Sequence, residues 1–389
     1  MKSALVIGGG ITGCTAAFEL SRDSSWTVDL IERNGYLGAG NKTQFYKGHP
    51  FTFGPRHFLT KEQWVYDYLN RYVPLRSCAD HQFLTLGRYK QEFVNYPLNY
   101  RDIDRFDDTE VIHNELSDIF LNSEIPAGTS YFDFYKFNLA SDAKNFEEFW
   151  IKSVGSTLYN DFINTYSKKM WMLDDNKLID DFTWSPKGVT IKKGGPECWS
   201  DAISAYPFAL NGYDDFFRIS TERVNVYLNT AIDNVDILKK TVEISGCRKS
   251  YDVIINTISL DRFFNYCYGE LPYIGRDLLK VLIPSEYVLP PNVYFLYYAG
   301  EEPYTRIVEY KKFTHYKSNS SLITIEIPSK NNKHYPLPIS KYINIHKRYD
   351  SELPDGFYSI GRAGSYMYNV DIDDAIMQAF DVVRDVRKG

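Results

Sequence analysis

Two short, mainly apolar segments lie near the N-terminus, residues 4–7 and 27–31, and a glycine-rich turn and a helical stretch over residues 14–23 separate them. Short apolar runs bounded by turn residues are typical of strands that are buried on both faces. Two such strands joined by a helix are typical of a parallel sheet. The pattern therefore predicts a βαβ unit at the start of the chain.

Later segments extend this pattern. Residues 251–257 and 356–362 are apolar runs of the same kind and predict further buried strands. Residues 143–171 carry apolar positions at three- and four-residue spacing, which predicts one long helix or two. Three segments rich in β-branched and aromatic residues predict antiparallel strands, residues 293–298, 306–310 and 322–327.

These elements predict an α/β fold with three structural units. A Rossmann-like cofactor-binding domain is expected from discontinuous segments, residues 1–80, 190–265 and 340–389. We expect a mostly helical domain over residues 81–189 and an antiparallel β-sheet substrate domain over residues 266–339. Glycine and charged residues make residues 184–195 the candidate for a lid over the substrate.

Composition excludes several classes of partner. The formal net charge is −6 and the isoelectric point is near 5.7, so no global positive field would attract nucleic acid or an anionic membrane. The five cysteines are scattered without CxxC spacing, which predicts neither a disulfide framework nor a metal site. No run of about 18 apolar residues predicts a membrane span. These features favour a cytoplasmic protein.

The turn after the first strand carries the spacing GxGxxG in Gly8, Gly10 and Gly13. Gly8 permits the tight turn, Gly10 lets backbone amides approach a pyrophosphate, and Gly13 allows close packing of helix against strand. Glu32 ends the second strand, where an acid accepts hydrogen bonds from an adenosine ribose. This combination of strands, glycines, helix and acid predicts a bound dinucleotide.

Two further features resemble large FAD-binding enzymes such as the amine oxidases. Residues 32–41 resemble their ER-x-x-x-x-GG stretch, and residues 361–362 resemble a late Gly-Arg pair that touches the flavin end of the cofactor. The resemblance implies FAD rather than NAD. The predicted cofactor-binding residues are Gly8, Gly10, Ile11, Thr12, Gly13, Glu32, Arg33, Gly40, Asn41, Arg362 and Asp371.

A series of motifs along nearly the whole chain resembles the UDP-galactopyranose mutase family. Residues 53–60, FGPRHFLT, resemble the family's loop beside the isoalloxazine, and residues 302–310, EPYTRIVEY, resemble the segment whose arginine clamps the substrate pyrophosphate. The other matches, in the same order as in the family, are residues 96–99, 162–171, 334–337 and 361–373.

The resemblance implies roles for particular residues. Arg306, Tyr335 and Tyr368 would hold the diphosphate of a nucleotide sugar, where an arginine fork and tyrosine hydroxyls stabilise the charge of a leaving group. The remaining predicted substrate-binding residues are Asn99, Tyr166, Trp171, Trp184 and Lys187.

Four positions depart from the family pattern. Arg56 and His57 occupy the flavin loop, and the sequence leaves open which of them faces the flavin. Lys187 lies where a second clamp arginine is expected, and it would supply that charge without the bidentate fork. Leu296 lies ten residues before Arg306, where the family places an asparagine near the nucleobase.

The activity implied by the resemblance is the interconversion of pyranose and furanose forms of a nucleotide-diphosphate sugar, without net oxidation. The implied chemistry is attack on the anomeric carbon by N5 of a flavin that NAD(P)H or another donor has reduced. The family also implies a homodimer. Two alternatives stay open, a conventional FAD-dependent oxidoreductase of the amine oxidase type and a flavoprotein without catalytic activity.

Overall fold

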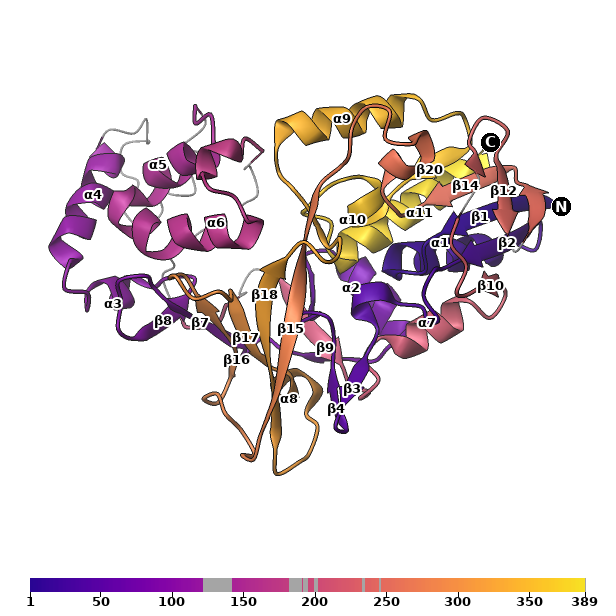
Figure 1. Cartoon of the computed structure of the whole chain (residues 1–389). Helices are drawn as coiled ribbons and strands as arrows, with labels where there is room; N and C mark the ends of the chain where they lie inside the picture. Colours follow the sequence, from indigo (N-terminus) through magenta and orange to yellow (C-terminus); the bar gives the residue numbers. More distant parts are fainter. Residues whose placement is uncertain are drawn as a thin grey trace.

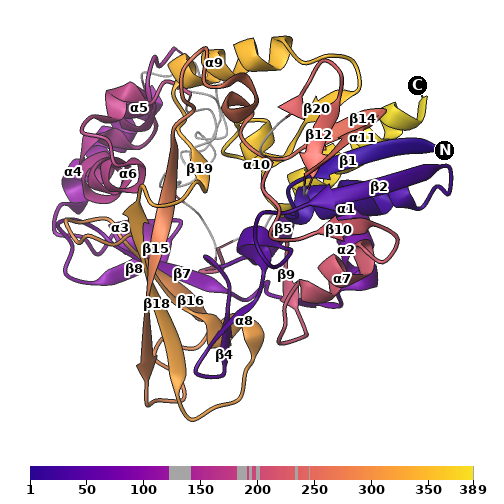
Figure 2. The same ribbon diagram turned by 45° about the vertical axis from the view of Figure 1, so that its right-hand side comes forward.

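The computed structural model describes residues 1–121, 142–181, 191, 195–198, 202–232, 235–244 and 246–388. A parallel sheet with its helices forms one side of the molecule, and a group of helices forms the other. A larger, mostly antiparallel sheet lies between and below them in Figure 1. Figure 2 shows the same arrangement after a 45° turn, with both chain termini at the edge of the parallel sheet.

The parallel sheet has five strands in the order β10-β2-β1-β14-β20. All four neighbouring pairs are parallel. The strands are β1 (Lys2–Ile7), β2 (Trp26–Ile31), β10 (Asn225–Tyr227), β14 (Val253–Asn256) and β20 (Phe357–Ser359). Strands from three distant parts of the chain thus form one sheet, as the scattered apolar runs predicted.

Helices pack on this sheet through apolar surfaces. Helix α1 (Ile11–Ser21) is buried on nearly every side and lies against α11 (Ile372–Lys388). In α11 the buried residues recur at the spacing of one helical face, which faces α1 and the sheet. The other helices of this half are α2 (Gln63–Tyr72), α7 (Asp214–Ser220), α9 (Ser340–Ser351) and α10 (Gly361–Gly364).

The larger sheet has seven strands in the order β19-β15-β18-β17-β16-β7-β8. Its strands are β7 (Gln82–Leu86), β8 (Phe93–Tyr96), β15 (Tyr273–Ile283), β16 (Val293–Tyr298), β17 (Arg306–Glu309), β18 (Ser321–Ser329) and β19 (Tyr335–Pro336). Every neighbouring pair is antiparallel except β16 and β7, which run parallel. The three strands predicted in this region all occur.

A helical group covers one face of the larger sheet. It consists of α3 (Tyr100–Ile103), α4 (Thr109–Leu121), α5 (Phe146–Leu158), a π-helical turn (Tyr159–Asn164) and α6 (Thr165–Trp171). The segment predicted as one long helix or two is therefore two helices joined by a π turn. Aromatic side chains from this group and from the sheet share one hydrophobic core.

Besides the 3-10 turns Ala39–Asn41, Asn176–Leu178 and Leu260–Phe264, the described structure contains small strand ladders and one short helix. Strand β3 (Gln44–Tyr46) pairs with β4 (His49–Phe51). Strand β9 (Ile203–Pro207) lies between β5 (Phe58–Thr60) and β6 (Leu75–Ser77), and β12 (Thr241–Ile244) lies between β11 (Val235–Asp236) and β13 (Cys247–Ser250). The short helix is α8 (Tyr310–Thr314).

The α/β fold class is confirmed, with a Rossmann-like sheet from discontinuous segments and a separate, largely antiparallel sheet. The predicted unit boundaries stay a prediction, and β7 and β8 lie within the range expected to be mostly helical although they belong to the larger sheet. In the described part of the chain, no helix combines the length and the apolar character needed to cross a bilayer.

Candidate active site

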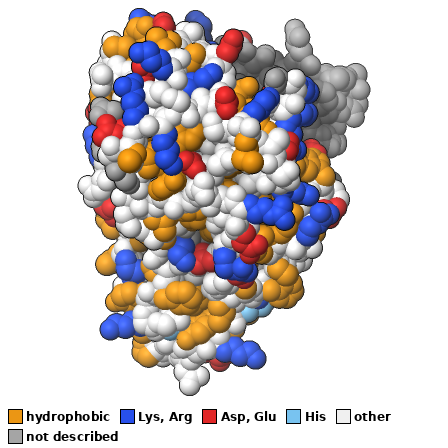
Figure 3. All heavy atoms as spheres, turned by 90° about the vertical axis from the view of Figure 1, so that its right-hand side faces the viewer, with side chains coloured by type: hydrophobic (Ala, Val, Ile, Leu, Met, Phe, Trp, Pro, Cys, Tyr) orange, Lys and Arg blue, Asp and Glu red, His pale blue; other side chains and the backbone are white. Residues whose placement is uncertain are grey.

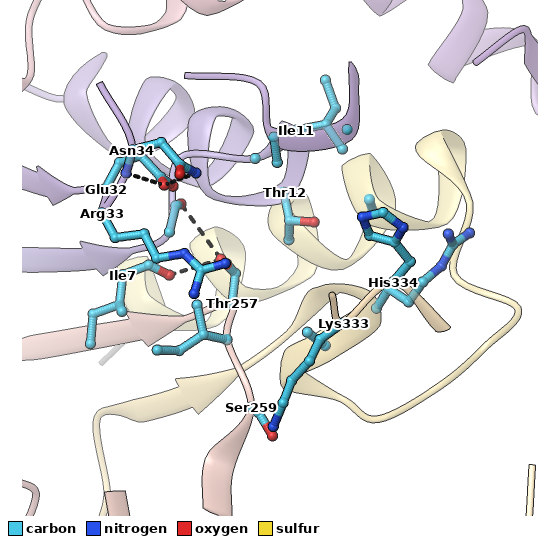
Figure 4. Close-up of a pocket in the computed structure, with 18 of the residues that line it drawn as sticks. Ile7, Ile11, Thr12, Glu32, Arg33, Asn34, Thr257, Ser259, Lys333 and His334 are labelled. Atoms are coloured by element: carbon cyan, nitrogen blue, oxygen red, sulfur yellow. Dashed lines mark hydrogen bonds between the residues drawn. The ribbon is translucent and has the colours of Figure 1, made fainter. Parts of the chain in front are cut away.

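A cavity with a volume of about 600 Å³ lies at the carboxyl ends of the parallel strands. Residues that follow β1, β2 and β14 line it, together with residues from the loop before β19 and from α10 and α11. Figure 4 shows Glu32 and Asn34 at one end of the view and His334 at the other. This is the edge at which open parallel sheets bind ligands.

The three glycines of the first turn have different surroundings. Gly8 has a φ of +101°, and a Cβ there would overlap Oγ1 of Thr257. A Cβ on Gly13 would overlap the carbonyl oxygen of Gly8, so this glycine brings α1 against β1. A Cβ on Gly10 would meet only Ala39, at 3.7 Å, and would otherwise point into open space. Gly10 therefore leaves room at the start of α1, where a helix stabilises an anion.

Glu32 is buried at the end of β2 and organises the neighbouring turn. One carboxylate oxygen accepts a hydrogen bond from the backbone N–H of Gly9 at 2.9 Å. The other accepts from the backbone N–H and the side-chain amide of Asn34 at 2.9 and 2.7 Å. The second of these oxygens already accepts two hydrogen bonds, whereas the oxygen bonded to Gly9 accepts one and keeps a lone pair for a ribose hydroxyl.

The structure brings the predicted cofactor-binding residues together. Gly13 lies behind the turn in the packing contact described above. All the others line the cavity: Gly8, Gly10, Ile11, Thr12, Glu32, Arg33, Gly40, Asn41, Arg362 and Asp371. Arg362 donates to the carboxylate of Asp371 at 2.6 Å, which joins α10 to the start of α11.

The two candidates in the flavin loop lie in different surroundings. Arg56 lines the cavity, and its Nε is buried without a hydrogen-bond partner in the described structure. His57 packs among aromatic rings, with Phe313 stacked at 5.8 Å and His81 edge-on at 5.2 Å. The geometry thus favours Arg56 for the cofactor contact.

Arg306 lies in β17 on the inner face of the larger sheet. Its Nη2 donates to Glu326 of the neighbouring strand at 2.7 Å, and both side chains are largely buried. Burial opposes the charge of the guanidinium, yet Glu326 keeps the pKa of Arg306 well above its ordinary value. The Nε of Arg306 is buried without a hydrogen-bond partner among the described residues, which leaves it a donor for a ligand.

Tyr335 lies at the point where the cavity meets the larger sheet. The guanidinium carbons of Arg276 and Arg362 lie 5.0 and 5.2 Å from the centre of its ring. Tyr368 packs against Tyr335 with ring centres 5.3 Å apart, and Trp171 packs against Tyr368 at 5.0 Å. These contacts join three of the predicted substrate residues to Arg362 of the cavity.

The electrostatic field around Tyr335 is strongly positive. Burial opposes ionisation of the phenol, but Arg56, Arg276, Arg362 and Arg306 together lower the pKa of Tyr335 below its ordinary value. Burial and three of these arginines lower the pKa of the adjacent His334 to about 3, so this histidine is neutral at physiological pH. The site is therefore suited to an anionic ligand.

Tyr166 and Trp171 face different parts of the site. Tyr166 contacts Tyr297 of β16, with ring centres 6.0 Å apart, whereas Trp171 contacts Tyr368. Both side chains are buried. Positions five apart on a helix point about 140° away from each other, which is why the two rings contact different neighbours.

Leu296, the residue compared with the family's asparagine near the nucleobase, lies on the opposite face of the sheet from Arg306. Leu296 packs with Leu289 and Val293 in a small cluster on the outer face of the larger sheet. Tyr297, which pairs with Arg306 across the strands, faces the inner aromatic core instead. Since successive residues of a strand point to opposite faces, counting ten residues back from Arg306 reached the wrong face.

The remaining predicted substrate residues are less informative. Asn99 caps α3 and accepts a hydrogen bond from the backbone N–H of Arg101 at 3.0 Å, so its contact with substrate stays a prediction. Trp184, Lys187 and most of the predicted lid over residues 184–195 lie outside the described residues.

Sequence reasoning missed Arg276 and several cavity residues that follow β14, among them Ser259 and Arg262. The residues after β14 could have been found, because the carboxyl end of any parallel strand in this sheet borders the same crevice. Arg276 carries no sequence signal of its own, because it reaches Tyr335 only through the pairing of β15 with β19.

Fold and site together define an enzyme with a Rossmann-like domain for a dinucleotide cofactor and an adjoining anion site. A family model described as UDP-galactopyranose mutase matches residues 161–368, more than half of the chain, and a model for an NAD(P)-binding Rossmann-like domain matches residues 6–72. The chain therefore belongs to the UDP-galactopyranose mutase family and is an isomerase. Family and domain together indicate a flavin cofactor.

Individual relatives agree with this assignment. The chain is 22% identical over 410 residues to a probable UDP-galactopyranose mutase of Klebsiella pneumoniae, covering 97% of this chain and 93% of the relative. It is 22% identical over 398 residues to a dTDP-fucopyranose mutase of Escherichia coli, covering 98% and 97%. A crystal structure of reduced UDP-galactopyranose mutase has a similar fold, with a TM-score of 0.79, 17% identity, and coverage of 100% and 96%.

Proposed function

We propose that the chain binds FAD in this cavity and interconverts the pyranose and furanose forms of a nucleotide-diphosphate sugar while the flavin is reduced. One observation carries the proposal: the cluster of arginines around Tyr335 adjoins the cavity through Arg56 and Arg362, which belong to both. A diphosphate held by the cluster would therefore lie next to the reactive end of a cofactor in the cavity.

The residues of the cavity fit FAD. Gly10 leaves open space at the start of α1 for a pyrophosphate, and Glu32 retains acceptor capacity for the ribose. The buried Nε of Arg56 has no hydrogen-bond partner among the described residues, and an acceptor on a flavin would satisfy it. The positive charge of Arg56 would also favour an anionic, reduced flavin.

The bound, reduced flavin would supply the N5 nucleophile for the anomeric carbon of the sugar. The protein would bind the nucleotide diphosphate as it leaves and keep it close enough to return. Arg306 is suited to this because Glu326 holds its guanidinium in place and its Nε remains a free donor. The hydroxyls of Tyr335 and Tyr368 would add hydrogen bonds from the side of the cavity.

The named relatives limit the substrate class without specifying the sugar. One acts on a UDP sugar and the other on a dTDP sugar according to their names. We therefore propose either a UDP or a dTDP derivative of a hexose. NAD(P)H or another donor would reduce the flavin before the cycle, which itself consumes no electrons.

The proposal can be tested with purified, flavin-loaded protein. Dithionite-reduced protein is incubated with UDP-galactopyranose and with dTDP-fucopyranose, and furanose products are separated by chromatography. We expect a furanose product from at least one substrate, none with oxidised protein, and no stoichiometric use of reductant. Steady oxygen consumption with a substrate oxidised in proportion would instead support the oxidoreductase alternative. Absence of a furanose product from both sugars would contradict the proposal.

Arg306→Lys provides the matched variant for the clamp. It keeps the positive charge beside Glu326 but loses the planar fork, so the fold and the flavin should be retained. We expect kcat/KM to fall by about 100-fold or more, on the scale of losing one preorganised donor. A variant that keeps wild-type kcat/KM would remove Arg306 from the proposed mechanism.

A further inference from the structure

The charges around Tyr335 do not balance within the described structure. The guanidinium carbons of Arg276 and Arg362 lie 5.0 and 5.2 Å from the centre of its ring, and Arg56 and Arg306 add positive charge to its surroundings. Arg306 pairs with Glu326, and Arg362 pairs with Asp371. Among the described residues, Arg56 and Arg276 form no ion pair. A buried cation without a counter-charge is costly, so the cluster is built to receive an anion.

Arg276 is held more rigidly than a surface arginine. Its residue is only 6% exposed. The side-chain amide of Asn332 bonds its backbone in both directions, accepting from the N–H at 3.1 Å and donating to the carbonyl at 3.3 Å. Nη1 donates to the carbonyl of Gly275 at 2.8 Å and to that of Met170 in α6 at 3.4 Å. These contacts fix the direction of the guanidinium.

The rest of the guanidinium group remains available for a ligand. Within the described residues, Nε and Nη2 of Arg276 make no hydrogen bond, and the planar group lies 5.0 Å from the ring centre of Tyr335. A diphosphate oxygen that accepts from the Tyr335 hydroxyl would thus lie near an arginine with free donors. Arginine suits this geometry because its fork binds phosphate at two points.

We propose that Arg276 is the second cation of the diphosphate site, in the place for which the sequence suggested Lys187. The inference rests on the proposed function, since it assumes a nucleotide-diphosphate ligand. It extends that proposal by giving each arginine a ligand. Arg306 and Arg276 bind the diphosphate from the sheet, and Arg56 faces the cofactor. The chain would then hold its leaving group with residues of rigid strands.

The test measures binding of UDP, dTDP and inorganic pyrophosphate to the flavin-loaded protein by calorimetry. Arg276→Gln removes the charge and keeps similar bulk, and it should weaken binding of the best of these ligands by at least 30-fold. Arg276→Lys should restore part of the affinity. Lys187→Gln should change it less than threefold. In a plot of log affinity against log salt concentration, the slope should become shallower in Arg276→Gln.

Arg348→Gln is the matched control. Arg348 also lies over a tyrosine ring, 4.0 Å from the centre of Tyr268, but it is exposed on α9 and does not line the cavity. It should bind the same ligand as the wild type does. Flavin absorbance and melting temperature are recorded for every variant, so that loss of fold is separated from loss of binding.

Several outcomes would overturn the inference. Wild-type affinity in Arg276→Gln would show that the residue only ties β15 to α6. If Arg276→Gln folds poorly, Arg276→Met, which also lacks the charge, takes its place, and wild-type affinity in that variant would lead to the same conclusion. A 30-fold loss in Lys187→Gln with none in Arg276→Gln would return the role to Lys187. If the wild type binds none of the three ligands, the proposed function itself fails.

Discussion

At the scale of single residues, the site concentrates positive charge in a chain whose net charge is −6. On the face seen in Figure 3, acidic and basic side chains are intermixed, so the surface there carries no single-sign field. The arginines around Tyr335 are instead partly or fully buried, where charges interact more strongly than in water. The proposed recognition of an anion would therefore depend on these local charges.

His334 gives a prediction about pH. Burial and the neighbouring arginines lower its pKa in the folded protein to about 3, against an ordinary value of 6.5. Between these values the unfolded chain binds a proton that the folded protein excludes, so acidification favours unfolding. From pH 6.5 to pH 5 this one group should cost about 2 kcal/mol of the free energy of unfolding.

The measurement compares urea unfolding of the wild type and His334→Gln from pH 8 to pH 5. Above pH 7 both states of the wild type carry a neutral histidine, so the difference between the two proteins should be constant there. Below pH 6.5 the wild type should lose stability faster than the variant. Parallel curves over the whole range would show that His334 titrates normally in the folded protein.

At the scale of elements, Gly10 and Gly13 at the start of α1 have different surroundings. Gly13 is needed for packing, because a Cβ there would overlap the backbone of Gly8, whereas the Cβ of an alanine at position 10 would point into open space. The φ of Gly10 is −75°, which an alanine adopts without strain. The same motif thus contains one glycine that packing requires and one that leaves open space at the start of α1.

Alanine substitutions should tell these glycines apart. Gly13→Ala should lower the free energy of unfolding of the apoprotein by about 3 kcal/mol or more, since the backbone must shift. Gly10→Ala should change it by less than about 1 kcal/mol but weaken FAD binding by about tenfold or more. Urea unfolding and FAD titration provide the two measurements. Equal effects of both substitutions on unfolding would contradict the assignment.

In strand β16, successive side chains point to opposite faces of the sheet, and this decides which of them a ligand can contact. Tyr297 faces Tyr166 and Arg306, and its neighbour Leu296 faces the outer cluster. Only the first therefore has access to a nucleotide bound on the inner face.

We expect both Tyr297→Ala and Leu296→Ala to lower the free energy of unfolding by about 2–5 kcal/mol, because each truncates a buried side chain. Only Tyr297→Ala should also weaken binding of UDP or dTDP, by about tenfold or more, as loss of an aromatic contact would. Calorimetry at a temperature where both variants remain folded is the measurement. A comparable loss of affinity in Leu296→Ala would place that residue at the substrate after all.

At the scale of the whole molecule, the cavity is assembled from segments far apart in the chain. The glycine turn, the loop with Arg56, the residues after β14, His334 and the Gly361–Arg362 pair meet only in the folded structure. A ligand that contacts all of them binds the folded state alone, and so stabilises the entire arrangement.

Cofactor binding should therefore protect more than the parallel sheet. With FAD at about 1,000 times its dissociation constant, the free energy of unfolding should rise by about 4 kcal/mol. Hydrogen exchange should slow in β15 and β18 of the larger sheet as well as in β1 and β14, because Tyr335 of β19 connects the cavity to that sheet. Protection confined to the parallel sheet would show that the two sheets unfold independently.

The assembly of the molecule stays a prediction. The family resemblance implies a homodimer, and sedimentation at micromolar concentration would measure it. A monomer under these conditions would leave the proposed chemistry unchanged, because every residue assigned to the site comes from a single chain.

The sequence by itself determined the features that depend on neighbouring residues. The GxGxxG turn, Glu32 after the second strand and the order of the later motifs were sufficient for the fold class, the family and the residues that line the cavity. These signals are local because a turn, a helix start and a strand end are each specified within a few residues. Ten of the eleven predicted cofactor residues consequently line one cavity, and the eleventh packs behind it.

Only the tertiary structure decided the features that depend on strand pairing and burial. Three such features arise from contacts across strands or between distant loops. Tyr297, and not Leu296, lies on the inner face of the sheet, Arg56 lies beside the cavity, and Arg276 approaches Tyr335. A shift of one residue in register reverses the face of a strand, and no local pattern in these segments specifies that register. The positive charge around Tyr335 could not be predicted from the sequence for the same reason, since it belongs to four arginines that are neighbours only after folding.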